Sequence, residues 1–445
     1  MSRVAGADES YLLAESNFGL SAPIQYLWIY ATDPGANAVK GLRDQLAAGV
    51  LDRRVVRARV PLARHRWVRA HQIPDVYTEA RVIGDDDVSD WADTRLRMAD
   101  LEPAAGAGWR LECAHTESGR LVLSLLVSHM ITDGQGLYNA LAAAHAGTST
   151  STLPTADDVR GWAGLRGDLA DSGSQVVEAA SAMRVVAKEL WRQRKRGGAA
   201  KPTRPASMLA SPSADDDAPD TTLAIVDIPK NEWIGTAKQH GGTPNGLLIA
   251  VLGGVVQRAG CPLTDDEMRI CIAVNRREDG DDRANASGGV WIRIRDEIGP
   301  ERGLGEIRAL CKNALREYAT SGNDKVADNL QPIVRLLPKK LIGKMMRSVV
   351  GPDATVSNLG VAPATSIELG ELTAESFAIR AIMVGHTAAD RRRQGPAIAA
   401  WAVEYGDKVT VTIFGIHPDY FGDTDSVRKQ ISEELTAWGL SATFW

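Results

Sequence analysis

The sequence predicts an α/β protein built from two lobes of similar size. Its 445 residues, of which 44% are hydrophobic, suffice for one large core or two smaller ones, and this length favours two. Strand-like and helix-like segments alternate on both sides of residues 197–220, a stretch rich in Pro, Ala, Ser and Asp that lacks hydrophobic periodicity. We therefore predict an N-terminal lobe over 1–196, a linker over 197–220 and a C-terminal lobe over 221–445.

The first half begins with a clear strand and a clear helix. Residues 24–30 (IQYLWIY) are continuously apolar, as in a buried strand, and 37–50 have the apolar spacing of a helix with a Gly near its end. The acidic segment 84–98 predicts an Asp-capped helix whose charges face solvent. A long helix is expected over 175–196. Shorter strand-like segments occupy 55–60, 76–83, 109–115 and 120–127.

The second half repeats the alternation after the linker. The segment YGDK at 405–408 lies between two apolar, strand-like runs, which indicates a hairpin turn. Helices are expected over 244–260, across roughly 303–350 and over 423–438. Strands are expected over 222–228, 268–274, 288–295, 354–363 and 376–384, and on both sides of the hairpin within 396–416.

Composition excludes several classes of function. A formal net charge of −5 and a pI near 6.0 argue against nucleic acid as the main partner. The four cysteines are far apart without a CxxC pair, which is typical of reduced thiols in a cytoplasmic protein. We expect no signal peptide and no transmembrane segment, because the N-terminus lacks an apolar stretch and no run of about 18 apolar residues occurs. His115, His386 and His417 lack Cys or carboxylate partners at ligand spacing, so no metal site is predicted.

A polar motif follows the apolar strand that ends near residue 127. His129, Asp133 and Gly134 form H-x-x-x-D-G, followed by a second glycine, Gly136, and a helix-like run. A histidine at this position can accept a proton near neutral pH from a substrate hydroxyl or amine, as general-base catalysis requires. Asp133 is poorly placed to complete a triad and is expected to hold the loop through an ion pair. The alternative is a core histidine with locally satisfied ring nitrogens.

The segment SHMITDG at 128–134 resembles the H-H-x-x-x-D-G signature of the chloramphenicol-acetyltransferase-like superfamily. That superfamily includes peptide-synthetase condensation domains, polyketide-associated acyltransferases and wax-ester synthase/diacylglycerol acyltransferase-like enzymes. Further segments are similar to the lipid acyltransferases in the same order along the chain. They are 51–68, the helix beginning near Asn245, IAVNRR followed by NASGGVWIRI, and VSNLG at 356–360.

The resemblance implies a fold and a reaction. Two acetyltransferase-like lobes of mixed sheets flanked by helices would be related by a pseudo-twofold axis, with His129 near the middle of a tunnel between them. A coenzyme A or acyl-carrier-protein thioester would enter from one face and an alcohol or amine acceptor from the other. His129 would deprotonate the acceptor, which attacks the thioester without an acyl-enzyme or a resident cofactor. Asp133 would pair with Arg277, or else with Arg276.

Other residues receive subsidiary predictions. Ser128 replaces the first histidine of the signature and is expected at the substrate site. Ser357 and Asn358 are expected to bind substrate or the oxyanion, with a turn at the strand end as the alternative. Asn285 is expected in a turn, or else in the tunnel wall.

Three basic segments could meet partners. Those at 192–196 and 391–393 are expected to be solvated surface, or else to bind coenzyme A phosphates or an acidic carrier protein. The basic, apolar segment 336–350 is expected to pack over the tunnel, or else to rest on a membrane surface. Two alternatives to a free-standing acyltransferase stay open: a condensation-type amide synthase with a carrier-protein donor, and a catalytically inactive binding protein, which Ser128 would favour.

Overall fold

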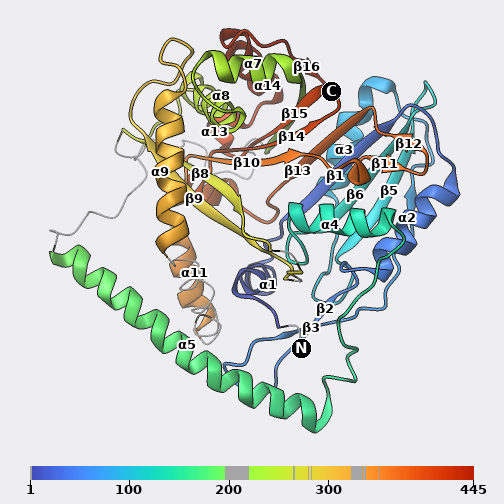
Figure 1. The fold of residues 1–445 in the computed structure, drawn as a ribbon, viewed down its shortest axis with the longest axis vertical. Coiled ribbons are helices and arrows are strands. Elements are labelled where there is room, and N and C mark those ends of the chain that lie inside the picture. Colours follow the sequence, from blue (N-terminus) through green and yellow to red (C-terminus); the bar gives the residue numbers. More distant parts are fainter. Residues whose placement is uncertain are drawn as a thin grey trace.

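The computed structural model describes residues 3–195, 220–263, 266–278, 280–281, 283–321, 334, 337–348 and 350–445. Two mixed β-sheets, each with helices packed against it, form the body of the molecule (Figure 1). All of the predicted linker except Asp220 lies outside the described residues, as does residue 196.

The first sheet has five strands in the order β13-β1-β6-β5-β4. Its centre is the pair β1 and β6, which are antiparallel and buried along their whole length, as their continuous apolar sequences predict. Its strands are β1 (Pro23–Tyr30), β4 (Tyr77–Thr78), β5 (Trp109–His115), β6 (Leu121–Ser128) and β13 (Ser376–Ala381).

Strand β13 departs from the division of the chain at residue 221. It comes from the second half of the sequence but pairs with β1 through six residues, from Ile24 opposite Ala381 to Ile29 opposite Ser376. The chain therefore crosses back into the first sheet before returning to the second. An apolar strand does not encode its sheet, because pairing depends on which edge is open in the folded chain.

The second sheet has seven strands in the order β16-β7-β15-β14-β10-β8-β9. Strands β14 and β15 form the predicted hairpin, with Tyr405 paired to Lys408 across a two-residue turn. Strand β10 runs parallel to both β8 and β14. The strands are β7 (Thr222–Pro229), β8 (Met268–Asn275), β9 (Ser287–Ile294), β10 (Ala354–Val361), β14 (Ile398–Tyr405), β15 (Lys408–Gly415) and β16 (Thr443–Phe444).

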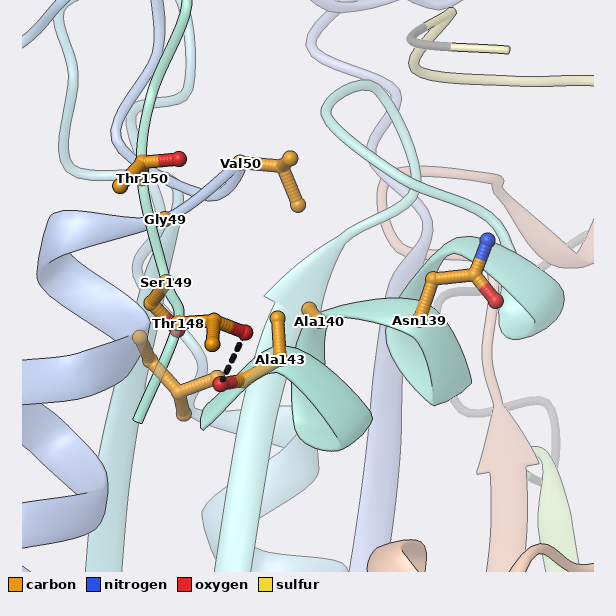
Figure 2. Close-up of a pocket in the computed structure, with 9 residues that line it drawn as sticks. Gly49, Val50, Asn139, Ala140, Ala143, Thr148, Ser149 and Thr150 are labelled. Carbon is orange, nitrogen blue, oxygen red and sulfur yellow. Dashed lines mark hydrogen bonds between the residues drawn. The ribbon is translucent and has the colours of Figure 1, made fainter. Parts of the chain in front are cut away.

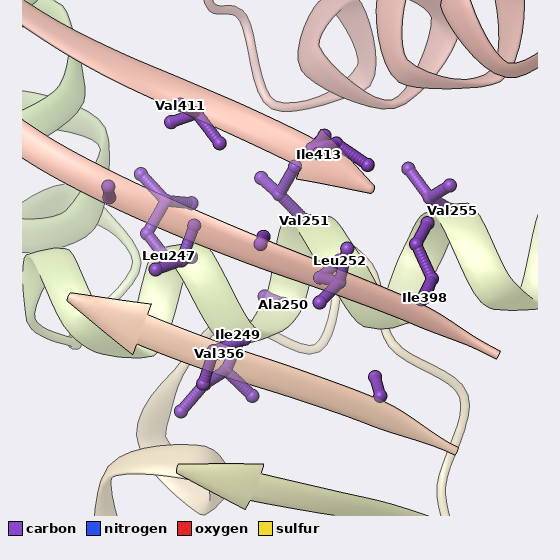
Figure 3. Packing of buried hydrophobic residues seen from close by; sticks show 14 of the residues in the cluster. Leu247, Ile249, Ala250, Val251, Leu252, Val255, Val356, Ile398, Val411 and Ile413 are labelled. Carbon is purple, nitrogen blue, oxygen red and sulfur yellow. The ribbon is translucent and has the colours of Figure 1, made fainter. Parts of the chain in front are cut away.

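Helix α8 (Pro244–Arg258) forms the core of the second lobe. Its residues from Gly246 to Val256 are all buried, and they pack against Val356, Ile398 and Ile413 of the sheet (Figure 3). Thr243 begins the helix by accepting a hydrogen bond from the backbone N–H of Gly246, and Pro244 occupies the first turn. A helix that is apolar on all sides must be buried, which fixes α8 between the sheet and the helices outside it.

Most of the other described helices pack around the two sheets, whereas α5 runs along the edge of the molecule, apart from both (Figure 1). These other helices are α1 (Gly6–Phe18), α2 (Ala36–Ala48), α3 (Val88–Arg97), α4 (Gly134–His145), α5 (Gly161–Lys195), α7 (Lys230–Gln239), α9 (Gly305–Ser321), α11 (Lys339–Ser348), α12 (Ala388–Gln394), α13 (Pro418–Phe421) and α14 (Thr424–Ala437), with 3-10 turns at Asp85–Asp87 and Ala364–Ser366. Two small sheets pair β2 (Arg54–Val56) with β3 (Arg66–Val68) and β11 (Glu368–Leu369) with β12 (Leu372–Thr373).

Helix α5 begins fourteen residues earlier than the predicted 175–196. Glycine and serine in its first part have low helix propensity, which hides this part in the sequence. Its inner face is polar, because Asp168 and Asp171 point inward and form ion pairs with Arg66 and Arg64. The usual apolar-inside period is therefore absent there, and tertiary ion pairs hold the helix in place.

Candidate active site

A cavity of about 350 Å³ lies between the two sheets. One wall comes from α1, β1 and β13, and the opposite wall comes from β8, β9, β10, β14 and β15. Most lining side chains are apolar, and polar ones come from both walls. The lining consists of Tyr11, Ala22, Ile24, His129, Asp133, Gly134, Ala273, Ser287, Thr355, Ser357, Leu359, Ile379, Ala381, Ile382, Met383, Pro396, Ala399, Trp401, Phe414 and Ile416.

His129 is the first residue after β6, and its half-buried ring borders this cavity. Its backbone N–H donates to the carbonyl of Ala22, which fixes the chain as it leaves the sheet. The ring stacks on Tyr11 of α1 with centroids 4.7 Å apart, and Nδ1 lies 2.8 Å from Oδ1 of Asn285. Burial lowers the pKa of His129, so the neutral imidazole prevails at pH 7.

Asp133 lies between the lobes and is 4% exposed. Its Oδ1 accepts from the backbone N–H of Gly136 at 2.7 Å, which caps α4, and from Nη2 of Arg277 at 3.0 Å. Its Oδ2 accepts from the backbone N–H of Ala286 at 2.7 Å. Arg277, rather than Arg276, is thus the ion-pair partner in this structure. Both carboxylate oxygens are occupied by protein donors, so Asp133 borders the cavity as a structural group.

Arg277 is itself held by the segment that follows it. Its guanidinium donates to the carbonyl groups of Asp281, Arg283 and Ala284 as well as to Asp133. These three residues of the loop after β8 therefore hold the guanidinium, and the ion pair joins them to the start of α4.

The two glycines of the motif are required for close packing, and neither has a positive φ. A Cβ at Gly134 would lie 2.6 Å from Cδ2 of Leu359 on β10, in the opposite lobe. A Cβ at Gly136 would lie 2.4 Å from Oγ1 of Thr132 and 3.2 Å from Nη2 of Arg277. The absence of side chains lets α4 approach both β10 and the ion pair.

The three predicted substrate-binding residues are placed differently. Ser357 lines the cavity, as do Thr355 and Leu359, because alternate residues of β10 face the same side. Asn358 is exposed on the other side, where its side chain accepts from the backbone N–H of Gly360. Ser128 is 5% exposed, does not line the cavity, and accepts from the backbone N–H of Met130. The structure therefore supports a place at the cavity for Ser357 and corrects the placement of Ser128 and Asn358.

The structure also brings three residues to His129 that the motif does not include. Tyr11 and Asp8 come from α1, and Asn285 comes from the segment before β9. Asn285 is 3% exposed and bonds to His129 and Asp8, so its role is neither a turn nor a cavity wall. Asp8 and Tyr11 are three residues apart on one helical face, which is the only local signal that links them.

Other predicted interaction sites lie away from the cavity. Arg391 and Arg392 are buried, and Arg392 forms an ion pair with Asp419 at 2.7 Å, so the expectation of solvated surface at 391–393 is wrong for these two side chains. The side chains of 192–196 lie outside those described. Helix α11 buries Ile342 and exposes Leu341 and Met345. None of these three residues lines the His129 cavity.

A second hollow, of about 210 Å³, lies between α2 and α4 (Figure 2). Its lining is made of small apolar, hydroxyl and amide side chains without a titratable group, among them Asn139, Ala143 and Thr148. In the part of the chain that the structure describes, no cluster of three or more His, Cys, Asp or Glu side chains could hold a metal ion. No helix in that part has the length and apolar character needed to cross a membrane.

Comparison with solved structures identifies the architecture. The condensation domain of the monacolin K polyketide synthase MokA superposes with a TM-score of 0.58 at 14% identity, covering 98% of this chain and 96% of that one. The wax ester synthase/diacylglycerol acyltransferase from Marinobacter aquaeolei VT8 gives 0.57 at 13% identity, covering 98% and 100%. The first condensation domain of the CDA synthetase gives 0.56 at 16% identity, covering 98% and 96%.

The chain has the two-lobed condensation-domain fold. No protein-family model matches the sequence, and no curated protein matches it closely. At identities of 11–16% a structural likeness establishes the condensation-domain fold and leaves the chemistry to the residues of the site.

Proposed function

We propose that this protein is an acyltransferase that moves an acyl group from a thioester to an alcohol or an amine, with His129 as the general base. The observation that carries the proposal is the position of His129. Its ring borders a largely apolar cavity between the two sheets, and its Nδ1 is occupied by Asn285. This leaves Nε2 as the nitrogen that can meet a substrate proton.

The reaction follows from this arrangement. The acceptor O–H or N–H gives its proton to Nε2 of His129 while its oxygen or nitrogen forms a bond to the thioester carbon, and negative charge develops on the carbonyl oxygen. Collapse of the tetrahedral intermediate breaks the C–S bond, and the thiolate takes the proton from Nε2. His129 is neutral again at the end, and no covalent enzyme intermediate is needed.

Hydroxyl groups on the opposite wall suit the developing charge. Ser357 and Thr355 of β10 and Ser287 of β9 are the hydroxyl side chains that line the cavity from the second sheet. A fixed O–H donor aimed at the carbonyl oxygen favours the tetrahedral intermediate over the flat thioester. We assign this role to Ser357, in the strand that faces the start of α4.

The cavity walls favour an uncharged, apolar acyl group. The cavity is lined by Trp401 of β14, by Phe414 of β15 and by Ile416, which directly follows β15. Burial of apolar surface against such walls contributes about 25 cal/mol per Å². A charged acyl group would lose its hydration in this space without gaining a partner.

The test of the general base compares His129→Ala with wild type, with release of free thiol as the signal. We expect turnover to fall by about 10²–10⁴-fold, the usual contribution of a general base. His115→Ala is the matched control, because His115 ends β5 and pairs with Asp33 at the surface. Undiminished turnover in His129→Ala, with a melting temperature close to that of wild type, would overturn the role of His129.

The donor is tested separately. The same acyl group is supplied on coenzyme A and on an acyl carrier protein, each with a panel of alcohols and amines. We favour coenzyme A, because the sequence resembles free-standing lipid acyltransferases. Reaction of the carrier-bound group alone would assign a carrier-protein donor, as in a condensation-type amide or ester synthase. Reaction with neither donor would reject acyl transfer and favour a binding protein of this fold.

A further inference from the structure

Helix α1 supplies a buried carboxylate to the surroundings of His129. Asp8 is fully buried in its first turn. Its Oδ2 accepts from the backbone N–H of Ala5 and from Nε1 of Trp67, both at 3.2 Å. Its Oδ1 accepts from the backbone N–H of Asn285 at 2.9 Å and from the side-chain nitrogen of the same residue at 3.0 Å. All four partners are N–H donors, which favours the ionised carboxylate and opposes the rise in its pKa that burial causes.

The amide of Asn285 has its orientation fixed by these contacts. Its Nδ2 donates to Oδ1 of Asp8 and, at 2.8 Å, to the backbone carbonyl of His129. Carboxylate and carbonyl oxygens can only accept, so the amide nitrogen must face them and the amide oxygen must face the imidazole. Oδ1 of Asn285 can in turn only accept from Nδ1 of His129, 2.8 Å away.

The tautomer of His129 follows from the same reasoning. Nδ1 carries the hydrogen, and in the neutral ring Nε2 holds the free electron pair. Burial lowers the pKa of His129. A hydrogen bond of the ring to the residue's own backbone, the charge of Asp133 and the hydrogen bond to Asn285 oppose this in part. Tyr11 covers one face of the imidazole at an interplanar angle of 17°. The ring is therefore held at one nitrogen and on one face, while its other nitrogen stays available.

We propose that Asn285, held by Asp8, is a positioning residue that keeps His129 in the Nδ1–H tautomer with Nε2 facing the cavity. A carboxylate, an amide and an imidazole thus form a relay in which the negative charge never touches the ring. Asp133 does not take this part, because its oxygens bond to Gly136, Arg277 and Ala286. The catalytic consequence rests on the proposed acyl transfer, whereas the tautomer is a property of the protein alone.

The tautomer can be measured without substrate. Protein labelled with 15N-histidine contains eight histidines, and a long-range 1H–15N spectrum distinguishes Nδ1–H from Nε2–H rings. The signal missing from His129→Gln identifies His129. We expect the Nδ1–H pattern in wild type and a shift toward Nε2–H in Asn285→Ala. An Nε2–H ring in wild type, or an Nδ1–H ring that persists in Asn285→Ala, would overturn the proposal.

Activity supplies the second readout. We expect Asn285→Ala to lower kcat about 10- to 100-fold with little change in KM, as the loss of an orienting partner does. Asn139→Ala, at an exposed position of α4, is the matched control and should leave kcat unchanged. A rise in KM with unchanged kcat would mean that Asn285 acts on substrate binding and would overturn the positioning role.

Two further outcomes separate the proposals. Where Asn285→Ala does not fold, Asp8→Asn keeps the shape of the side chain and should give a smaller shift of tautomer in the same direction. If the His129 spectrum is unchanged in Asp8→Asn, the amide of Asn285 keeps its orientation without the carboxylate. That result would remove Asp8 from the relay. Wild-type protein with the Nδ1–H ring but without thiol release from any donor would reject the acyltransferase and keep the relay.

Discussion

Two buried aspartates flank His129, and they are used in parallel ways. Asp133 precedes α4 and accepts from the backbone N–H of Gly136, and Asp8 lies in the first turn of α1 and accepts from the backbone N–H of Ala5. The positive end of each helix dipole favours the carboxylate there. Their other contacts reach consecutive backbone N–H groups, those of Asn285 for Asp8 and Ala286 for Asp133.

They differ in the charge that compensates them. Asp133 faces the guanidinium of Arg277, whereas the hydrogen bonds of Asp8 come from neutral N–H groups. The charged pair fixes the loop after β8 to the start of α4, and removal of Asp133 alone leaves Arg277 as an uncompensated cation. Asp8 is instead held by four neutral N–H groups, with the charge of Arg53 also favouring its ionised form, so its carboxylate can orient the amide of Asn285. One carboxylate therefore fastens the two lobes together, and the other acts on the histidine through Asn285.

The comparison predicts its largest effect at Asp133. Asp133→Ala leaves Arg277 buried without a counter-charge and removes the cap of α4, so we expect unfolding to be easier by about 3–5 kcal/mol. Urea denaturation with a check for unchanged m value measures this cost.

The double variant Asp133→Ala with Arg277→Met removes both charges and is the matched control. It should recover part of the loss, because the desolvation of an unpaired guanidinium is relieved. A cost below about 1 kcal/mol for Asp133→Ala, of the size of a surface pair, would contradict a buried ion pair at this position.

A smaller effect is expected at Asp8. Asp8→Asn keeps the volume but turns one acceptor into an N–H group that faces other N–H donors, which should cost about 1–3 kcal/mol. Asp44→Asn is the surface control, because Asp44 is 47% exposed beside Arg43 and should be close to neutral. A cost at Asp8 equal to that at Asp133 would erase the distinction between the two aspartates.

The smallest effect concerns pH and His129. Burial lowers the pKa of the folded-state imidazole below the ordinary value of 6.5, so the unfolded chain takes up the proton first as pH falls. Stability from this group is complete above about pH 6.5 and declines below it until the folded-state pKa is reached. One proton limits the slope to about 1.4 kcal/mol per pH unit.

Stability profiles of wild type and His129→Gln, measured between pH 8 and pH 5, isolate this contribution. The glutamine keeps a polar side chain without titrating, and the other histidines contribute equally to both proteins. We expect the wild type to lose more stability than the variant as pH falls below 6.5. A wild-type profile that gains stability relative to the variant at low pH would mean that the folded-state pKa of His129 is raised.

Local patterns made much of this molecule predictable. Continuous apolar runs predicted β1 and β6, Gly-Asp between apolar segments predicted the β14–β15 hairpin, and the motif after β6 singled out His129, Asp133 and Gly134 as candidates. These features depend on neighbours a few residues away, so the sequence carries them directly. The partner Arg277 came from the resemblance of a second motif to known acyltransferases, since 144 residues separate it from Asp133.

The sequence by itself determined the alternation of strands and helices and the polar motif at the exit of β6. Only the tertiary structure decided that β13 joins the first sheet, that Ser128 and Asn358 do not line the cavity, and that α1 and the segment before β9 meet at His129. Asp8 and Asn285 are 277 residues apart, and each looks locally like an ordinary polar residue near the end of an element. Their roles depend on burial, because an amide and a carboxylate excluded from water must hydrogen-bond to one another. The packing of the two sheets decides which of these groups become neighbours.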